Sequence, residues 1–343
     1  MALAEPAKLV DGARIFLFNG DADGIVGQHI LGLETGRPDA RITGRKRDIE
    51  LLRLAPPLER GELHVLDISL RRNLDALNAL LPILATQEKG GLRITWYDHH
   101  DSGTPPEHPG LTLHINQAPE TCTAVIVNAV LGHKHPLWAA MAAFGDNLPA
   151  TASALASTGG ASSHEAALLR RVGVLINYNA YGDEPGDALF AADELARRLE
   201  AYPSALDFCW EPSIVAPLAE QFDADRERFL GIAPLVDAPG AGAYLVPDEA
   251  FARRYGATWA NEQVMRNPDQ ALAVLHPRKD GTYTVSIRAP RAWRGGGATA
   301  PSAAELAQEF PTGGGRKLAA GIDALPPGQL DRFAERFKAF YGS

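Results

Sequence analysis

The sequence predicts an α/β protein whose N-terminal half is built around a parallel sheet. Short apolar runs of strand length alternate there with segments in which apolar residues recur at helical spacing. Alternation of this kind is typical of parallel sheets that are covered by helices on both faces. A stretch with helical spacing throughout follows, and then a smaller second α/β unit. The chain has 343 residues, which is long enough for two domains.

The predicted elements follow one another in a regular order. In the first half, strands are expected at 15–18, 42–43, 63–66, 92–97 and 111–115, and helices at 24–36, 48–54, 70–84, 121–131 and 136–144. Residues 165–230 have helical spacing and no convincing strand. In the last third, strands are expected at 243–246, 271–275 and 283–287, and helices at 303–310 and 330–341. We therefore expect a first domain at 1–185, a helical connector at 186–238 and a second domain at 239–343.

Composition and charge exclude several classes of protein. No apolar run approaches the roughly 18 residues that a membrane span needs, and the first six residues lack the basic-then-apolar pattern of a signal peptide. The only two cysteines, Cys122 and Cys209, are too few for a disulfide framework, so we expect a cytoplasmic protein. The net charge of −9 argues against binding to long duplex DNA. It favours a small phosphorylated substrate or a short oligonucleotide.

Acidic and imidazole side chains follow three of the predicted strands. Asp21 and Asp23 come just after the first strand, Asp67 ends the third, and Asp98-His99-His100 ends the fourth. Because ligands bind at the carboxyl ends of the strands in open α/β sheets, these groups are expected to meet at one edge. Carboxylate oxygens with an imidazole suit Mn²⁺ or Mg²⁺ better than a metal that prefers thiolates. The sequence therefore predicts a metal site there.

Most of these motifs have a structural alternative. The Asp21-Ala-Asp23 turn could simply cap the following helix, and Asp67 could cap the helix expected near residue 70. Asp146 follows an apolar helix and could be an ordinary loop carboxylate. The tripeptide 98–100 is harder to explain structurally, since adjacent imidazoles point in different directions and can serve metal and substrate separately. The basic run 45–47 either lines a substrate path or is a solvated charge run.

Four motifs follow one another along the chain: the pair Asp21 and Asp23, then Asp67, then the tripeptide 98–100, then Asp146. In this order they resemble the motifs of the DHH superfamily of phosphoesterases. That superfamily includes RecJ-type exonucleases, nanoRNases that also dephosphorylate pAp, cyclic-dinucleotide phosphodiesterases and family II pyrophosphatases. The resemblance extends to the C-terminal half, where Ser286-Ile-Arg288 and the glycine-rich stretch 313–321 are similar to the DHH-associated domain. The implied architecture is a catalytic DHH domain, a helical connector and a smaller substrate-binding domain, with the active-site cleft between the two domains.

The resemblance also implies two Mn²⁺ or Mg²⁺ ions and a ligand set. Asp21 would bind the first ion, and Asp67 would bridge the two. Asp23, His99 and Asp146 would bind the second. Two ions about 3.5–4 Å apart stabilise the charge of an in-line phosphoryl displacement.

Further residues are implied to contact the substrate. His100 would contact the scissile phosphate, and Asp98 would orient the histidine pair. Arg288 and the loop Gly313-Gly314-Gly315-Arg316 would bind a phosphate, and the loop is expected to precede a helix near Lys317 whose N-terminus attracts anions. Arg316 stands where relatives carry histidine, and arginine still binds phosphate bidentately.

One departure concerns the first ion. Relatives carry a histidine or aspartate just upstream of the paired aspartates, where this chain has Leu17 and Asn19. Leucine cannot bind a metal, so the expected ligand set includes Asn19, whose neutral carbonyl oxygen would fill the first site together with water, or the first site would be occupied only with substrate. The expected activity is hydrolysis of phosphodiester or phosphomonoester bonds in short oligonucleotides or nucleotides. The alternatives are a RecJ-like single-strand exonuclease and a degenerate nucleotide-binding regulatory protein, and a homodimer is compatible with either.

Overall fold

The computed structural model describes residues 12–342 apart from 87–89, 183, 185 and 293–300. The N-terminal residues considered above for a signal peptide lie outside this part. Contacts divide the chain into two compact units, Met1–Glu220 and Gln221–Ser343. The boundary falls within helix α9 (Pro212–Leu230). The three-part division at 185/186 and 238/239 stays a prediction about independently folding domains.

Unit 1 contains a five-stranded sheet in the order β2-β1-β3-β4-β5. All of its neighbouring strands pair in parallel. The strands are β1 (Arg14–Phe18), β2 (Ala40–Thr43), β3 (Gly61–Leu66), β4 (Leu92–Asp98) and β5 (Leu111–Ile115). Each matches an expected strand to within a few residues, so the predicted parallel sheet is confirmed.

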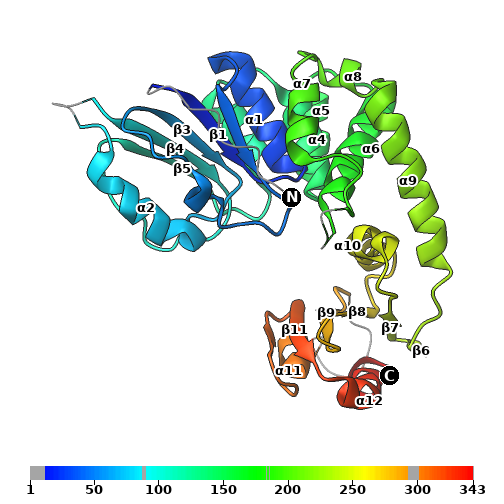
Figure 1. Ribbon diagram of the computed structural model, residues 1–343. Coiled ribbons are helices and arrows are strands. Elements are labelled where there is room, and N and C mark those ends of the chain that lie inside the picture. The colour runs from blue at the N-terminus through cyan, green and yellow to red at the C-terminus, as the bar shows by residue number, and fades with distance from the viewer. Residues whose placement is uncertain (1–11, 87–89, 183, 185, 293–300, 343) are drawn as a thin grey trace. The chain divides into compact units, whose positions relative to one another are not determined.

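Both faces of this sheet are buried, as the continuous apolar character of its strands requires. On one face, Ile15 and Leu17 belong to a core that also contains Leu77 of α2 (Leu74–Leu80). On the other face, Phe16 lies next to Gly32 of α1 (Ala22–Thr35). Figure 1 shows α1 and α2 on opposite sides of the strands. Successive residues of a strand point to opposite faces, so one run of sequence supplies both cores.

The remaining helices of unit 1 follow β5 in the sequence. They are α3 (Thr123–Val130), α4 (Pro136–Gly145), α5 (Pro149–Thr158), α6 (Ser163–Ala180), α7 (Ala192–Leu199) and α8 (Ala205–Phe208). The single helix expected at 70–84 is instead α2 between two 3₁₀ turns, and Pro82 lies in the second turn. Proline lacks the N–H that an α-helix needs, which explains the break.

Unit 2 contains a six-stranded mixed sheet in the order β10-β11-β9-β8-β7-β6. The strands are β6 (Val236–Ala238), β7 (Ala241–Leu245), β8 (Ala271–Pro277), β9 (Tyr283–Arg288), β10 (Gly313–Gly315) and β11 (Ala319–Leu325). Of these described strands, only β7 and β8 pair in parallel, and the helix between them, α10 (Ala250–Arg266), supplies the crossover that a parallel pair needs. Helices α11 (Ala303–Ala307) and α12 (Leu330–Tyr341) complete the unit.

The helix expected near Lys317 is wrong, because that segment forms the turn and second strand of the β10–β11 hairpin. Ala320 and Ile322 of β11 are buried while the residues between and after them are less so, which is the two-residue period of a strand. The N–H of Arg316 donates to the carbonyl of Ala319 at 2.8 Å. The glycine-rich segment therefore does not form the N-terminus of a helix. The expectation that a helix N-terminus attracts an anion here does not apply.

Within the described ranges, no helix is both long and apolar enough to cross a bilayer. Cys122 and Cys209 are both buried and unbridged.

Candidate metal centre

The predicted residues meet at the carboxyl edge of the parallel sheet, where β1, β3 and β4 end. The chain leaves β1 through α1 towards β2 on one side, and β3 pairs with β1 on the other. The strand order therefore reverses between β1 and β3, and such reversal points are where open α/β sheets bind ligands. Asp21 follows β1, Asp67 follows β3 and Asp98 is the last residue of β4.

Asp21 caps helix α1, as the structural alternative for this motif expected. Its Oδ1 accepts hydrogen bonds from the backbone N–H groups of Asp23 at 3.0 Å and Gly24 at 3.2 Å. A side chain at position 24 would clash, because a Cβ there would lie 2.2 Å from the carbonyl oxygen of Asn19. Glycine thus permits the tight turn that brings both aspartates to the sheet edge.

Asp23 is fixed by a second helix. Its Oδ2 accepts from the backbone N–H of Thr123 at 2.6 Å, and its Oδ1 accepts from that of Ala124 at 2.8 Å. These are the first residues of α3, whose N-terminus favours a negative charge. Only 1% of Asp23 is exposed. Both oxygens are oriented, and each keeps lone-pair capacity for a metal ion.

Asp67 adopts a left-handed backbone conformation, with φ of 58°. Such a conformation is uncommon outside glycine, although aspartate adopts it more readily than most residues, and it recurs at functional sites. The Asp67 N–H donates to the carbonyl of Tyr97 at 3.0 Å, and the Thr123 hydroxyl donates to Asp67 Oδ1 at 3.4 Å. The carboxylate is 2% exposed and lies beside those of Asp21 and Asp23. Burial and this negative charge raise the pKa of Asp67 well above its usual range.

The adjacent histidines make different contacts. His99 Nε2 lies 3.5 Å from Asp67 Oδ1 and 3.9 Å from Asp23 Oδ2. His100 Nδ1 instead lies 2.7 Å from Oδ1 of the fully buried Asp98. This hydrogen bond and the negative charge around it raise the pKa of His100, although burial opposes the effect. Asp98 therefore orients His100, and His99 faces the carboxylates.

Asp146 reaches the same place from the C-terminal end of α4. Gly145 allows this approach, because a Cβ there would lie 2.6 Å from Ala22 Cβ and 2.8 Å from the carbonyl oxygen of Gly173. Burial and the charges of Asp23 and Asp21 raise the pKa of Asp146 to about 8. The negative charge of Asp146 is therefore unfavourable in this position unless a proton or a cation neutralises it.

Two groups of described residues could hold a metal ion. One is Asp23, His99 and Asp146, and the other is Asp67, His99 and His100; in each group the ligand atoms lie within 4.8 Å of one another. The first coincides with the set that the resemblance implies for the second ion. Its oxygen and imidazole donors suit Mn²⁺, and a divalent ion would relieve the crowding of carboxylates. Asp21 belongs to neither group.

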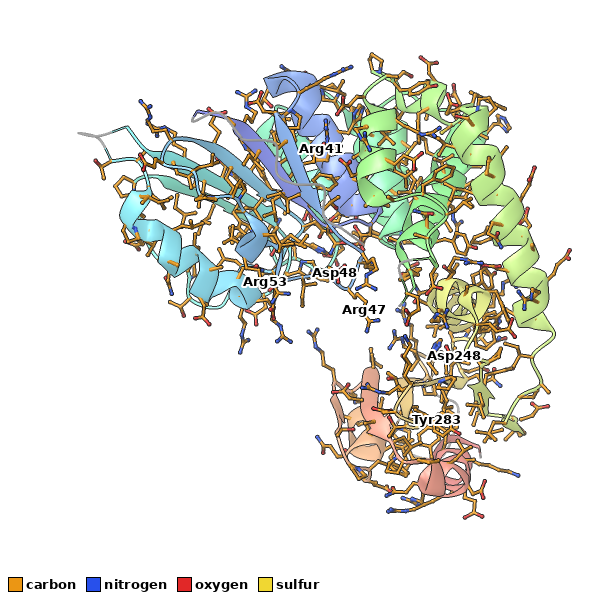
Figure 2. The ribbon with its side chains drawn as sticks, in the orientation of Figure 1. Arg41, Arg47, Asp48, Arg53, Asp248 and Tyr283 are labelled. Carbon is orange, nitrogen blue, oxygen red and sulfur yellow. The ribbon has the colours of Figure 1, made fainter. Side chains whose placement is uncertain are left out.

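The surroundings of Asp21 contain Lys46, a member of the basic run 45–47 for which the sequence left a substrate path and a solvated charge run open. Lys46, in the loop after β2, places its Nζ 2.5 Å from Asp21 Oδ2. Burial alone would raise the pKa of Asp21, but the charge of Lys46 together with hydrogen bonds from Asp67, Lys46 and Gly24 lowers it to about 2, and the ion pair raises the pKa of Lys46 against its burial. Asn19 lies between them: its Oδ1 accepts from the Asp21 N–H at 3.2 Å, and its Nδ2 donates to the Lys46 carbonyl at 3.1 Å. The next two residues of the loop, Arg47 and Asp48, lie at the lower edge of unit 1 in Figure 2.

Apart from His100, the expected substrate-binding residues lie within unit 2. Arg288 is the last residue of β9 and pairs with Ala319 of β11. Ala319 follows the hairpin turn that contains Arg316, so the two arginines lie at the same end of this sheet. Gly313 allows the hairpin to contact α11, because a Cβ there would lie 1.7 Å from the carbonyl oxygen of Ala307. Arg316 is exposed.

Comparison with solved structures finds similar folds. An exonuclease RecJ bound to manganese aligns over 96% of this chain and 90% of its own, with a TM-score of 0.57 and 19% identity. RecJ from Thermus thermophilus in complex with Mn²⁺ aligns over 96% of this chain and 52% of its own, with a TM-score of 0.57 and 18% identity. The present chain therefore spans about half of that protein. The pGpG-specific phosphodiesterase PggH of Vibrio cholerae aligns over 95% of this chain and 99% of its own, with a TM-score of 0.53 and 14% identity. No family model and no curated protein sequence matches the chain.

These similarities cover nearly the whole chain and both of its sheets. The shared fold agrees with the resemblance that the sequence motifs indicate. The chain thus has the fold that these RecJ and PggH structures share.

Proposed function

We propose that the protein is a phosphoesterase that depends on a divalent metal and hydrolyses phosphodiester or phosphomonoester bonds in short oligonucleotides or nucleotides. The observation that carries this proposal is the group Asp23, His99 and Asp146, whose ligand atoms converge at the carboxyl edge of the parallel sheet. The same fold in a manganese-bound RecJ and in a pGpG-specific phosphodiesterase supports it. Mn²⁺ or Mg²⁺ is the proposed cofactor.

The bound ion would supply a Lewis acid that lowers the pKa of a water molecule and withdraws charge from the phosphate. The protein positions the remaining groups. Asp23 is held by the N-terminus of α3, so its orientation does not depend on the ion. Asp67 lies within 3.5 Å of His99 and can accept a proton or contribute a further metal oxygen.

His100 is suited to contact the substrate. Its side chain is 47% exposed, and Asp98 holds its Nδ1 at 2.7 Å. With Nδ1 held by Asp98, the other ring nitrogen, Nε2, can donate to a phosphate oxygen when the ring is charged. The ring is thus a proton donor that is oriented before the substrate arrives.

Unit 2 would bind a second part of the substrate. Arg288 and Arg316 lie at one end of its sheet, and two guanidinium groups suit a phosphate. We propose residues 1–185 as the catalytic domain, 239–343 as the substrate-binding domain and 186–238 as their connector. The net charge of −9 favours nucleotides and short oligonucleotides over long polymers.

The test is a panel of substrates with Mn²⁺, covering pAp, short RNA, short DNA, cyclic dinucleotides and pyrophosphate. We expect hydrolysis of at least one nucleotide or short oligonucleotide, its loss after treatment with EDTA, and its restoration by Mn²⁺. His99→Gln should abolish it, whereas Glu107→Gln, which changes an exposed carboxylate, should not. Binding without cleavage across the whole panel would favour the regulatory alternative. Rapid degradation of long single strands would favour a RecJ-like exonuclease.

A further inference from the structure

Lys46 forms a partly buried ion pair with Asp21, beside the metal ligands. Its Nζ lies 2.5 Å from Asp21 Oδ2 and 3.2 Å from Asn177 Oδ1. The ring of Tyr181 lies 5.4 Å from the same nitrogen, in the geometry of a cation–π contact. The Lys46 side chain is 32% exposed and that of Asp21 only 5%. This lysine is therefore a fixed part of the site and not a solvated charge on its rim.

The ion pair leaves Asp21 little capacity to bind a metal. A carboxylate has about four lone-pair positions. Two N–H groups, those of Asp23 and Gly24, already donate to Oδ1, and the Lys46 ammonium donates to Oδ2. An ion bound at Asp21 would have to displace the ammonium or lie against its positive charge. In agreement, Asp21 is absent from both groups of described residues that could hold a metal.

The turn after β1 is built to hold the Lys46 loop. A Cβ at Gly20 would lie 1.9 Å from the carbonyl oxygen of Gly44, so the two loops touch along their backbones. Asn19 ties them together, because Nδ2 donates to the Lys46 carbonyl and Oδ1 accepts from the Asp21 N–H. Aspartate at position 19 would lack the donor that faces Lys46. Asn19, which stands where relatives carry a metal ligand, is thus the residue that positions Lys46.

We propose that the ammonium of Lys46 takes the place of the first of the two expected ions, so that the site works with a single divalent ion held by Asp23, His99 and Asp146. The inference deepens the proposed function and rests on it. An ammonium has three N–H groups, and Asp21 and Asn177 accept from two of them. The third is available to a phosphate oxygen of the substrate. Lys46 would then act as a catalytic residue that supplies a positive charge independently of the metal concentration.

The test counts the bound ions. Purified protein is stripped with EDTA, dialysed against a series of Mn²⁺ concentrations and analysed for manganese per chain, and its electron paramagnetic resonance spectrum is recorded. We expect a single Mn²⁺ per chain with the hyperfine pattern of an isolated ion. Lys46→Met should admit a second Mn²⁺ and give an exchange-coupled spectrum, because it frees Asp21. Its turnover at low Mn²⁺ should fall about 100-fold, the typical loss when a charge-stabilising donor is removed.

Two controls separate this role from general electrostatics. Lys46→Arg keeps the charge and should retain the single ion. Arg53→Gln removes a positive charge from an exposed pair with Glu50, at 3.4 Å, on the edge of unit 1 that Figure 2 shows. It should leave the ion count unchanged.

A wild-type protein that binds two coupled ions would overturn the proposal, and this result needs no variant to fold. A folded Lys46→Met protein that binds one ion and keeps full turnover would also overturn it. No bound ion at all would instead refute the proposed metal-dependent function, so the two failures are distinguishable.

Discussion

The crowded carboxylates predict that Asp146→Asn makes the metal-free protein more stable. Asp146 has its pKa raised from 3.8 to about 8. A carboxyl group with a raised pKa in the folded state stabilises the fold at low pH, and this contribution is lost as the pH rises through the folded value. Asparagine carries no such charge. The variant should therefore gain stability between pH 4 and pH 8, and its advantage should grow across that range.

The size of the effect follows from the shift. One pKa unit corresponds to about 1.4 kcal/mol, so at pH 7 the ceiling is about 4 kcal/mol. Asp21, Asp23 and Asp146 share the unfavourable charge and can relax together. We therefore expect about 2 kcal/mol in the free energy of unfolding. Mn²⁺ should reverse the order, because a ligand at 100 times its Kd adds about 2.7 kcal/mol to the protein that binds it.

The assay is urea denaturation in EDTA and in Mn²⁺ over this pH range. Glu107→Gln serves as the matched control, because it removes an exposed carboxylate away from the site. The reasoning is refuted if Asp146→Asn is no more stable than the wild type in EDTA at pH 8. An equal gain from Mn²⁺ in both proteins would show that Asp146 is not a ligand.

Three further predictions concern other parts of the chain. Gly24→Ala should lower the free energy of unfolding by about 1–3 kcal/mol through the clash with Asn19, whereas Gly328→Ala, which meets no atom within 4 Å, should change it little. Burial lowers the pKa of His29 to about 3, so the free energy of unfolding should fall as the pH drops below 6.5. His29→Gln should reduce the slope of this free energy against pH by up to about 1.4 kcal/mol per pH unit, and an unchanged slope would contradict the reasoning. Arg316→Ala should raise KM more than it lowers kcat, and a kcat loss at unchanged KM would count against uniform phosphate binding.

The parallel sheet and its acidic edge could be predicted from the sequence because both depend on local patterns. Strand-length apolar runs determine where β1, β3 and β4 lie, and Asp21, Asp67 and Asp98 follow from their ends. Parallel strands place their carboxyl ends on one edge, so the convergence of these residues needed no long-range information. Asp146 could be assigned to the site only through the resemblance, because nothing in the sequence of α4 shows that Gly145 packs against α1.

The β10–β11 hairpin shows where local reasoning failed. A glycine run followed by a basic residue and alanines is compatible with both a helix entry and a hairpin. Tertiary contacts decide between them: β11 lies between β9 and β10 and buries Ile322 and Leu325, and Gly313 fits against α11. Alanine's helix propensity is a weak preference of a few tenths of a kcal/mol, and the burial of two large side chains outweighs it.

Lys46 could not be assigned from the sequence, because its role arises from two loops 25 residues apart. From the sequence, the run 45–47 is either part of a substrate path or a solvated charge run, and nothing singles out Lys46. What distinguishes Lys46 is the contact between Gly20 and Gly44 and the amide of Asn19, which together fix the loop. From the sequence alone, Asn19 looks like a lost metal ligand and therefore a weakness of the site. In the structure, the side-chain amide of Asn19 holds the loop that places the Lys46 ammonium where the first metal ion was expected. The absence of a metal ligand at position 19 therefore goes together with a cation that the neighbouring loop supplies.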